Sequence, residues 1–463
     1  MIRNSFKAAL LIATLPAPAL AERPVLGPET MNYISVDAPV VAITHVRVVD
    51  GTGTPARTGQ TLILDNGTIK ALGPDAATPA PAGAKVIDGT GKTVIPGLVH
   101  MHEHLFYTIL QGKAYSYNAE TFTKLYLAGG VTSMRTGGSM HFAGDLHIRD
   151  SINRGSQPGP WIDTTGPYIN QEGSVPQLMT IKNPEEAAAA VNFYADQGAM
   201  SFKAYMHVTR AALREAIAAA HKRNLKLTAH LCSVTLREAA DLGIDNIEHG
   251  LGAASDFQPG KEPDKCPTTA PDFSDPKKVT ELLQYLKAKN VAMTSNVALS
   301  DTDRETPGLD VLAPNVAAMF MEKRRQPQRG PTAPPSERLT RQIKFDKAFY
   351  DMGGLLMIGT DPTGSGGVVP GFSNVHEIEL RVENGFKFEE VIKASTMNAA
   401  VYERRANVIG SLAAGKQADV VLINGDPTTR PRDMRNIEVV FKQGWGYDPK
   451  KLIDTVRGKA GLY

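Results

Sequence analysis

Residues 200–231 read MSFKAYMHVTRAALREAIAAAHKRNLKLTAHL, and this stretch carries the repeating pattern of the middle of the chain. A short apolar run, MSFKAYM, precedes the amphipathic stretch REAIAAAHKRN, and a second short run, KLTAHL, follows it. Short apolar runs favour buried strands, whereas the stretch between them has the pattern of a surface helix. Strands that alternate with helices are typical of a parallel sheet. The segment therefore predicts one strand–helix–strand unit.

The same alternation extends to both sides of this segment and gives eight units. The candidate strands are GLVHMH (97–102), VTSMRT (131–136), WIDTTG (161–166), MSFKAYM (200–206), KLTAHL (226–231), NIEHG (246–250), VAMTSN (291–296) and LLMIGTD (355–361). We therefore expect an α/β chain whose middle folds as a (β/α)8 TIM barrel with insertions. An open doubly wound sheet is the alternative, but no glycine-rich phosphate loop follows the first candidate strand.

Short β-like runs separated by turns dominate the two ends of the chain. Asn66-Gly67, between two such runs, is a strong signal for a hairpin. We expect the two ends to form a small β-sandwich module, with its N-terminal part over 22–95 and its C-terminal part and tail over 406–463. The barrel then occupies 96–405.

The overall charge balance narrows the class of partner. The 50 basic and 48 acidic residues leave a net charge of +2, which argues against binding driven by bulk attraction to nucleic acid or an anionic membrane. Hydrophobic residues make up 42% of the chain, enough for a core. We expect a small-molecule substrate, and association into a homo-oligomer stays open.

Residues 1–21 have the three parts of a secretory signal peptide. Arg3 and Lys7 supply positive charge, 8–15 form an apolar stretch, and 19–21 have the small residues of a cleavage site. That stretch is too short to span a bilayer, and no later run approaches the ~20 apolar residues of a membrane helix. We expect a periplasmic or secreted protein, with an ordinary amphipathic first helix as the alternative.

The chain has two cysteines, Cys232 and Cys266, and an oxidising compartment would allow them to pair. Both follow residues that we assign to adjacent strand ends, which favours a disulfide. Two inert buried thiols are the alternative.

Candidate metal ligands gather at the ends of the predicted strands. His102 and His104 alternate across Glu103, and the two-residue period of a strand directs both imidazoles to one face. The pair alone is as often an accident of sequence as a metal site. Four further residues with ligand chemistry end other strands: Lys203, His230, His249 and Asp361. Because the active site of a barrel lies at the carboxyl ends of its strands, we expect all six to face one site.

The segments that carry these residues resemble the amidohydrolase superfamily, specifically members with two metals bridged by a carboxylated lysine. They are PGLVHMHEH (96–104), FKAY (202–205), TAH (228–230), IEHG (247–250) and GTDP (359–362). The tail segments HEIELRVENGFKFEEVIKASTMNAAVYERR and GSLAAGKQADVVLINGDP resemble the same family, so the likeness spans residues 40 to 430. Within the superfamily, the chain is most similar to imidazolonepropionase-like and Xaa-Pro-dipeptidase-like members.

The resemblance implies a site for two divalent ions. His102, His104 and Asp361 would hold one ion, His230 and His249 the other, and Lys203 would bridge them as a carbamate formed from CO2. The ligand types suit Zn²⁺, with Mn²⁺, Co²⁺ or Fe²⁺ as replacements. Deaminases of the superfamily typically use one metal and lack the lysine, so Lys203 favours a hydrolase.

The implied reaction is hydrolysis of a C–N bond next to a carbonyl, in an amide, peptide, carbamate or urea. A metal-bridging hydroxide would attack, and Asp361 would carry the proton to the leaving nitrogen. A phosphotriester or lactone is the alternative substrate. A non-catalytic scaffold protein is a more remote alternative, which would predict missing ligands.

The resemblance also bears on His100 and Tyr205, whereas His141 and Tyr168 are candidates because they follow the second and third predicted strands. His100 departs from the family pattern, which commonly has Asp there, and we expect it to pack or hydrogen-bond in the same place. Tyr205, His141 and Tyr168 are candidate substrate-binding residues, and His376 is expected to be structural.

Two long connections rich in Pro, Gly and charge, 251–275 and 300–335, are predicted to be lids over the site. Candidates for binding a substrate carboxylate, among which we make no choice, are Arg135, Arg210, Arg304 and the run at 323–325.

Overall fold

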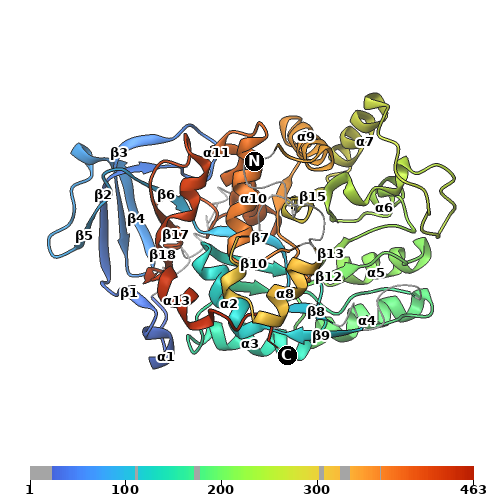
Figure 1. Ribbon diagram of the computed structural model, residues 1–463, viewed down its shortest axis with the longest axis horizontal. Helices are drawn as coiled ribbons and strands as arrows, with labels where there is room; N and C mark the ends of the chain where they lie inside the picture. The colour runs from blue at the N-terminus through green and yellow to red at the C-terminus, as the bar shows by residue number, and fades with distance from the viewer. Residues whose placement is uncertain are drawn as a thin grey trace, which may run out of the picture.

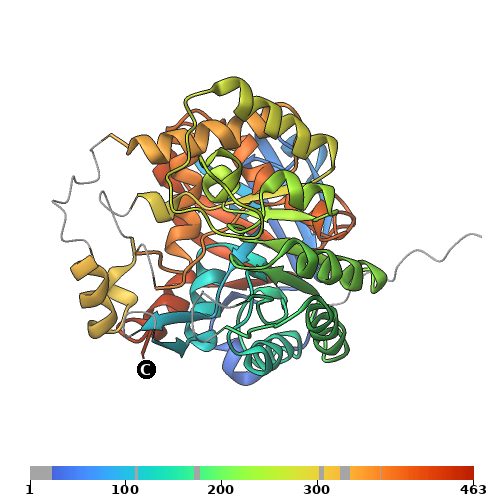
Figure 2. The same cartoon turned by 90° about the vertical axis from the view of Figure 1, so that its right-hand side faces the viewer.

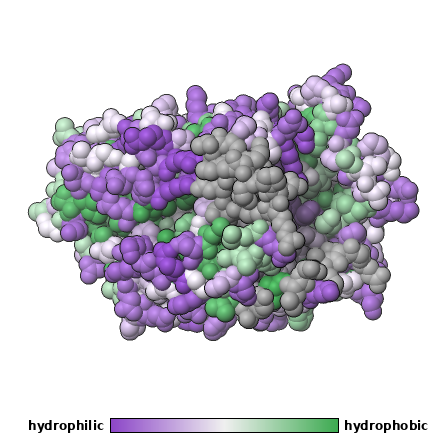
Figure 3. Space-filling model, viewed as in Figure 1, coloured by the Kyte–Doolittle hydropathy of each residue, from purple (hydrophilic) through white to green (hydrophobic). Residues whose placement is uncertain are grey.

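The structure is a computed structural model that describes residues 23–109, 113–171, 178–301, 307–323, 334–364 and 367–462. The expected signal peptide, residues 1–21, lies outside these ranges, as do parts of the second predicted lid. None of the helices in the described ranges combines the length and the apolar character needed to span a bilayer. In Figure 3, hydrophilic residues cover much of the visible face, with small hydrophobic areas between them.

The two ends of the chain share one nine-stranded sheet, on the left of Figure 1 in blue and red. Its order is β1 (Ile34–Val36), β19 (Trp445–Tyr447), β18 (Ile437–Lys442), β17 (Val420–Asn424), β6 (Lys92–Pro96), β2 (Val40–Val48), β3 (Arg57–Asp65) and β4 (Thr68–Pro74), with β5 (Lys85–Asp88) beside β2. The antiparallel pairing of β17 with β6 joins the C-terminal segment to the N-terminal one. The hairpin predicted at Asn66-Gly67 is confirmed, because these residues turn β3 into β4 with φ of 44° and 89°.

All eight strands predicted for the middle of the chain are present. They are β7 (Leu98–Glu103), β10 (Val131–Thr136), β11 (Trp161–Asp163), β12 (Ser201–Ala204), β13 (Lys226–Ala229), β14 (Asn246–Glu248), β15 (Ala292–Ser295) and β16 (Leu356–Ile358). They pair in parallel as two sheets, in the orders β11-β10-β7 and β12-β13-β14-β15-β16. A parallel bridge between Thr165 and Ser201 connects the sheets on one side. On the other side, the Asp361 amide donates to the His102 carbonyl at 2.9 Å.

Helices lie around these strands, as Figure 2 shows. In chain order they are α1 (Pro28–Met31), α2 (Ala119–Ala128), α3 (Phe142–Asn153), α4 (Pro184–Asp196), α5 (Arg210–Lys222), α6 (Leu236–Asp241), α7 (Pro276–Ala288), α8 (Pro314–Lys323), α9 (Glu337–Asp351), α10 (Phe372–Glu383), α11 (Phe388–Ala394), α12 (Met397–Tyr402) and α13 (Pro449–Val456). In α5, Thr209 caps the first turn by accepting from the Ala212 amide. Leu213, Ala216 and Ile217 are buried on one face, so this helix packs on the strands through an apolar stripe. The chain is therefore a mixed α/β fold.

Two glycines let the strands approach closely where the predicted ligands lie. A Cβ on Gly137, which follows β10, would come within 2.3 Å of the His102 ring, and one on Gly359, after β16, within 2.5 Å of the His102 Cβ. Both positions therefore require glycine for His102 to keep its place. A short hairpin of β8 (Phe106–Ile109) and β9 (Ala114–Tyr117) follows β7 beside this region.

Candidate metal centre

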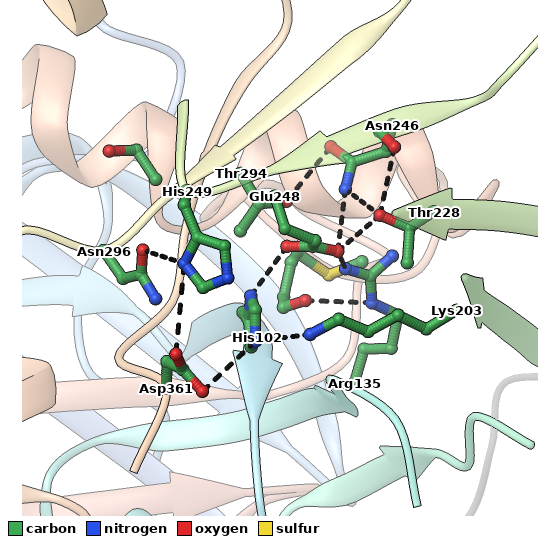
Figure 4. A network of polar contacts seen from close by, with 12 residues as sticks. His102, Arg135, Lys203, Thr228, Asn246, Glu248, His249, Thr294, Asn296 and Asp361 are labelled. Carbon is green, nitrogen blue, oxygen red and sulfur yellow. Dashed lines mark hydrogen bonds and ion pairs between the residues drawn. The ribbon is translucent and has the colours of Figure 1, made fainter. Parts of the chain in front are cut away.

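The six predicted ligands come from five strands, and the structure brings their side chains together. His102 lies in β7 and His104 just beyond it, and Lys203 lies in β12. His230, His249 and Asp361 follow the ends of β13, β14 and β16. Figure 4 shows His102, Lys203, His249 and Asp361 directed toward one another.

His102 is at the centre of the cluster. Its Nε2 lies 2.9 Å from Lys203 Nζ and 3.4 Å from Asp361 Oδ1. The same carboxylate oxygen lies 2.9 Å from His104 Nε2. The His249 ring centre is 4.8 Å from that of His102.

His230 joins the cluster through His249. The centres of these two rings are 4.2 Å apart. His249 and Asp361 have φ of 65° and 56°, in the left-handed region that residues with a Cβ seldom adopt. Such conformations concentrate at functional sites, where the surrounding structure holds them. Here they turn both side chains into the cluster.

The residues fit a divalent cation. His102, His249 and Asp361 each offer one ligand atom, and these atoms lie within 4.8 Å of one another. His249 Nε2 and His104 Nδ1 are buried and have no hydrogen-bond partner among the described residues. An unpartnered buried polar atom costs free energy, which a bond to a metal would offset at His249 Nε2. Imidazole and carboxylate together are a donor set that suits Zn²⁺ and related ions.

Burial and neighbouring charges set the protonation of the ligands. Burial lowers the pKa of His104 and that of His249 to about 4, so both imidazoles are neutral at neutral pH. Burial raises the pKa of Asp361, but His102 and His104 outweigh it and hold that pKa well below its usual value. Burial also lowers the pKa of the Lys203 amine to about 8. The centre therefore combines two neutral imidazoles with an ionised carboxylate. Burial and Lys203 lower the pKa of His102, but Glu248 and Asp361 outweigh them and raise it.

Two of the three predicted substrate-binding residues lie beside the cluster. Lys203 Nζ is 5.5 Å from the ring centre of Tyr168 and 6.0 Å from that of Tyr205. Tyr205 also packs edge-on against His230, with ring centres 5.0 Å apart. Burial raises the pKa of Tyr205 to about 12, so its hydroxyl stays protonated and is a hydrogen-bond donor.

The third residue, His141, lies at the start of α3, in the connection that follows β10. Its side chain is exposed and caps α3, where Nδ1 accepts from the Gly144 amide at 2.9 Å. Its ring stacks on Tyr117, with ring centres 4.8 Å apart. A histidine at a helix start has a local partner, the first free amides of the helix, and the substrate-binding role of His141 stays a prediction.

His100 occupies a buried hydrogen-bonding position under the centre. Its Nδ1 lies 2.8 Å from Asn374 Nδ2 and 3.2 Å from Glu103 Oε1. Glu103 in turn accepts from the Thr360 amide at 3.1 Å, one residue before Asp361. These hydrogen bonds connect β7 to the turn that carries Asp361. His100 therefore packs and hydrogen-bonds in this position, as we expected.

Sequence reasoning missed two buried partners of the ligands. Glu248 Oε2 lies 2.7 Å from His102 Nδ1, and Asn296 Oδ1 lies 2.9 Å from His249 Nδ1. Both residues are visible in the sequence as polar side chains at the ends of apolar strands, Glu248 within the IEHG segment. That signal was available, but it does not say which ligand each would contact.

The long segment 251–275 is fixed at several points. Cys232 and Cys266 are joined by a disulfide, which connects this segment to the turn after β13. Arg210 binds Asp264 through two nitrogens and so is part of the same attachment. Of the other arginines proposed for a substrate carboxylate, Arg135 is buried against Glu248, and residues 304, 324 and 325 lie outside the described ranges.

Comparisons with known proteins identify the family and the fold. The sequence model of the amidohydrolase family matches residues 93–446. An enamidase of Eubacterium barkeri is 29% identical over 182 residues, a match that covers 33% of this chain and 45% of the enamidase. The match thus spans less than half the length of that relative.

Two solved structures share the fold over most of both chains. A Xaa-Pro dipeptidase with bound methionine in the active site is 19% identical, with a TM-score of 0.66, and the match covers 88% of this chain and 100% of the dipeptidase. Molinate hydrolase is 18% identical, with a TM-score of 0.65, over 90% of this chain and 96% of the hydrolase. The family model covers well over half of the chain, including all six clustered residues. The chain therefore belongs to the amidohydrolase family of enzymes.

Proposed function

We propose that this amidohydrolase cleaves a C–N bond next to a carbonyl, with two divalent metal ions held by the six clustered residues. The proposal depends mainly on one observation: imidazoles, a lysine amine and a carboxylate lie together in one buried cluster. Within it, His102 Nε2 is 2.9 Å from Lys203 Nζ. The names of the enamidase and the Xaa-Pro dipeptidase describe enzymes that act on such bonds, and they support the choice.

We also propose that the eight parallel strands close into a (β/α)8 barrel. The bridge from Thr165 to Ser201 and the bond from Asp361 to His102 support closure, because they join the two sheets at both seams. The strand ends that carry the ligands would then form the catalytic face. The nine-stranded sheet of the two chain ends would fold over on itself as the β-sandwich module.

His102, His104 and Asp361 would hold one ion, and His230 and His249 the other. Zn²⁺ is the metal that this donor set favours. Bound there, two ions supply a water of lowered pKa and polarise the substrate carbonyl. The remaining chemistry belongs to the side chains of the chain itself.

Lys203 is suited to become a carbamate that bridges the ions. The reaction needs a neutral amine: Nζ bonds to the carbon of CO2, and the proton leaves the nitrogen. Burial lowers the pKa of Lys203 to about 8, so roughly a quarter of the amine is neutral at pH 7.5, against about 0.1% at the ordinary pKa of 10.4.

Asp361 acts as the proton shuttle. Its carboxylate is ionised at neutral pH, because the neighbouring histidines hold its pKa low, and it lies at the mouth of the cluster with 14% of its side chain exposed. It accepts the proton of the attacking water and delivers it to the leaving nitrogen. Tyr205 and Tyr168 border the same space and would contact the substrate.

Metal content and a substrate panel test the proposal together. Purified protein is expected to contain about two metal ions per chain. In a panel of N-acyl amino acids, dipeptides, aryl carbamates, phosphotriesters and lactones, it should hydrolyse a member of the first three classes. Lys203→Ala should lose most of the metal, whereas Lys277→Ala, an exposed lysine of α7, should retain it. One ion per chain that survives Lys203→Ala would overturn the bridge. Turnover of phosphotriesters or lactones alone would overturn the choice of bond.

Export to the periplasm or the medium is the second part of the proposal. The three-part pattern of residues 1–21 and the disulfide between Cys232 and Cys266 support it. Mature protein isolated from a cell fraction outside the cytoplasm should begin at Glu22. Protein found in the cytoplasm with Met1 intact would contradict it.

A further inference from the structure

A buried glutamate, Glu248, lies directly behind the proposed ligand His102. Neither side chain has any exposed surface, and Glu248 Oε2 lies 2.7 Å from His102 Nδ1. Figure 4 shows Glu248 between the His102 ring and Arg135, on the far side of the ring from Lys203 and Asp361. A carboxylate is seldom buried without partners, so its other contacts matter.

Three donors converge on the other oxygen of Glu248. Arg135 Nη2, the Thr228 hydroxyl and Asn246 Nδ2 all donate to Oε1, the last at 3.0 Å. Oε2, in contrast, has His102 as its partner. These contacts hold the carboxylate in one orientation, in which Oε1 accepts from the three donors and Oε2 contacts the His102 imidazole.

Arg135 is itself anchored. Its Nε donates to the Met101 carbonyl at 2.9 Å, in the strand that carries His102. Arg135, in β10, is thereby attached to β7, the strand of His102, and Glu248 of β14 contacts both side chains. The guanidinium of Arg135 forms a buried ion pair with Glu248, which favours the ionised carboxylate.

The tautomer of His102 follows from these contacts. An ionised carboxylate only accepts hydrogen bonds, so Nδ1 of His102 carries a proton, and a His102 that binds a metal must be without a proton on Nε2. The lone pair is then on Nε2, the nitrogen that faces Lys203 and Asp361. A metal can bind only that lone pair.

We propose that Glu248 is a positioning residue that presents His102 Nε2 to the metal by fixing both the ring orientation and its tautomer. The inference rests on the proposed metal site. It goes beyond that site because Glu248, which would touch no ion, would raise the metal affinity through His102. Asn296 holds His249 in the same way, but with a neutral acceptor. Because Glu248 is charged, its hydrogen bond with His102 is stronger than the hydrogen bond between Asn296 and His249.

The glutamine variant is expected to reverse the tautomer. In Glu248→Gln, the three donors that point at the position of Oε1 are unchanged and can be satisfied only by an acceptor. The amide oxygen must therefore take that position. The amide NH2 group then faces His102 Nδ1 and donates to it. His102 Nδ1 becomes the acceptor, the proton moves to Nε2, and the ligand lone pair is lost.

Equilibrium dialysis against buffered Zn²⁺ measures the effect, with Glu438→Gln as the matched control. Glu438 is a partly exposed glutamate of β18 that pairs with Lys92. Glu248→Gln should weaken binding of the tighter ion about 10–100-fold, the usual effect of losing such a partner. The control should bind as the wild type does. Equal affinity in Glu248→Gln and the wild type would overturn the positioning role, whereas a wild type that binds no Zn²⁺ would overturn the metal site itself.

A measurement on the wild type covers the case in which Glu248→Gln does not fold. In Zn²⁺-loaded protein labelled with ¹⁵N-histidine, His102 is expected to carry a slowly exchanging proton on Nδ1 and to bind the metal through Nε2. A spectrum in which Nδ1 is the ligand nitrogen overturns the proposal. Circular dichroism of the metal-free variant tells which of the two experiments applies.

Discussion

Asp361→Asn is the substitution that most directly separates proton transfer from metal binding. The change is isosteric, and asparagine tolerates the left-handed backbone of this position, where φ is 56°. The backbone bond from residue 361 to the His102 carbonyl, 2.9 Å long, does not involve the side chain and is retained. The amide oxygen can still occupy the place of Oδ1, 2.9 Å from His104 Nε2. We therefore expect the fold and most of the metal to remain.

What the variant loses is the ionised group that accepts a proton. General acid–base catalysis contributes on the order of 10²–10⁴-fold, so kcat should fall by that factor, which equals about 3–5 kcal/mol of barrier. Initial rates on the substrate found in the panel, measured beside metal content, give the result. Asp454→Asn, in α13 and partly exposed, is the matched control and should have normal turnover. Full activity in Asp361→Asn with metal bound would refute the proton-shuttle role.

Three further predictions concern the fold around the site. Replacing both Cys232 and Cys266 by serine opens a loop with a sequence separation of 34 and should cost about 4 kcal/mol of stability; calorimetry should show a melting temperature lower by about 4 °C, and an unchanged value would contradict the cross-link. Gly137→Ala places a methyl group against the ring of the first ligand histidine and should lower metal affinity, whereas Gly252→Ala, with open space around it, should not; equal affinities would refute the steric argument. Burial lowers the pKa of His376, but two carboxylates outweigh it and raise that pKa to about 9. Its ion pairs should therefore contribute about 3 kcal/mol to the free energy of unfolding below pH 6.5, and this contribution is lost as the pH rises through 9. Urea unfolding at pH 6.5 and 9.5 checks this, and the loss should be absent in His376→Gln.

The strands of the middle were predictable because parallel strands are buried on both faces. Each then reads as a short apolar run, and the strand at Asn246–Glu248 is recognisable although it has three residues. The clustering of the six candidate ligands was predictable for a related reason, since the carboxyl ends of parallel strands meet at one edge and each candidate lies at such an end. A polar residue that directly follows a short apolar run can be placed at a strand end from the local sequence alone.

The contacts between strands were not predictable in this way. Glu248 and Arg135 are 113 residues apart, and only the folded sheets bring the guanidinium to the carboxylate. Arg135 was a candidate for binding a substrate carboxylate, with a solvated charged face as the alternative, yet its side chain is 1% exposed and pairs with Glu248. His141 has a local partner that the strand pattern did not predict, the Gly144 amide in the first turn of α3.

Anomalous diffraction at the zinc edge, from crystals grown with Zn²⁺, tests the central claim most directly. The account predicts two peaks about 3.5–4 Å apart, one beside His102 and His104 and the other beside His230 and His249, with continuous density joining Lys203 to both. A single peak, or peaks away from these histidines, would contradict it.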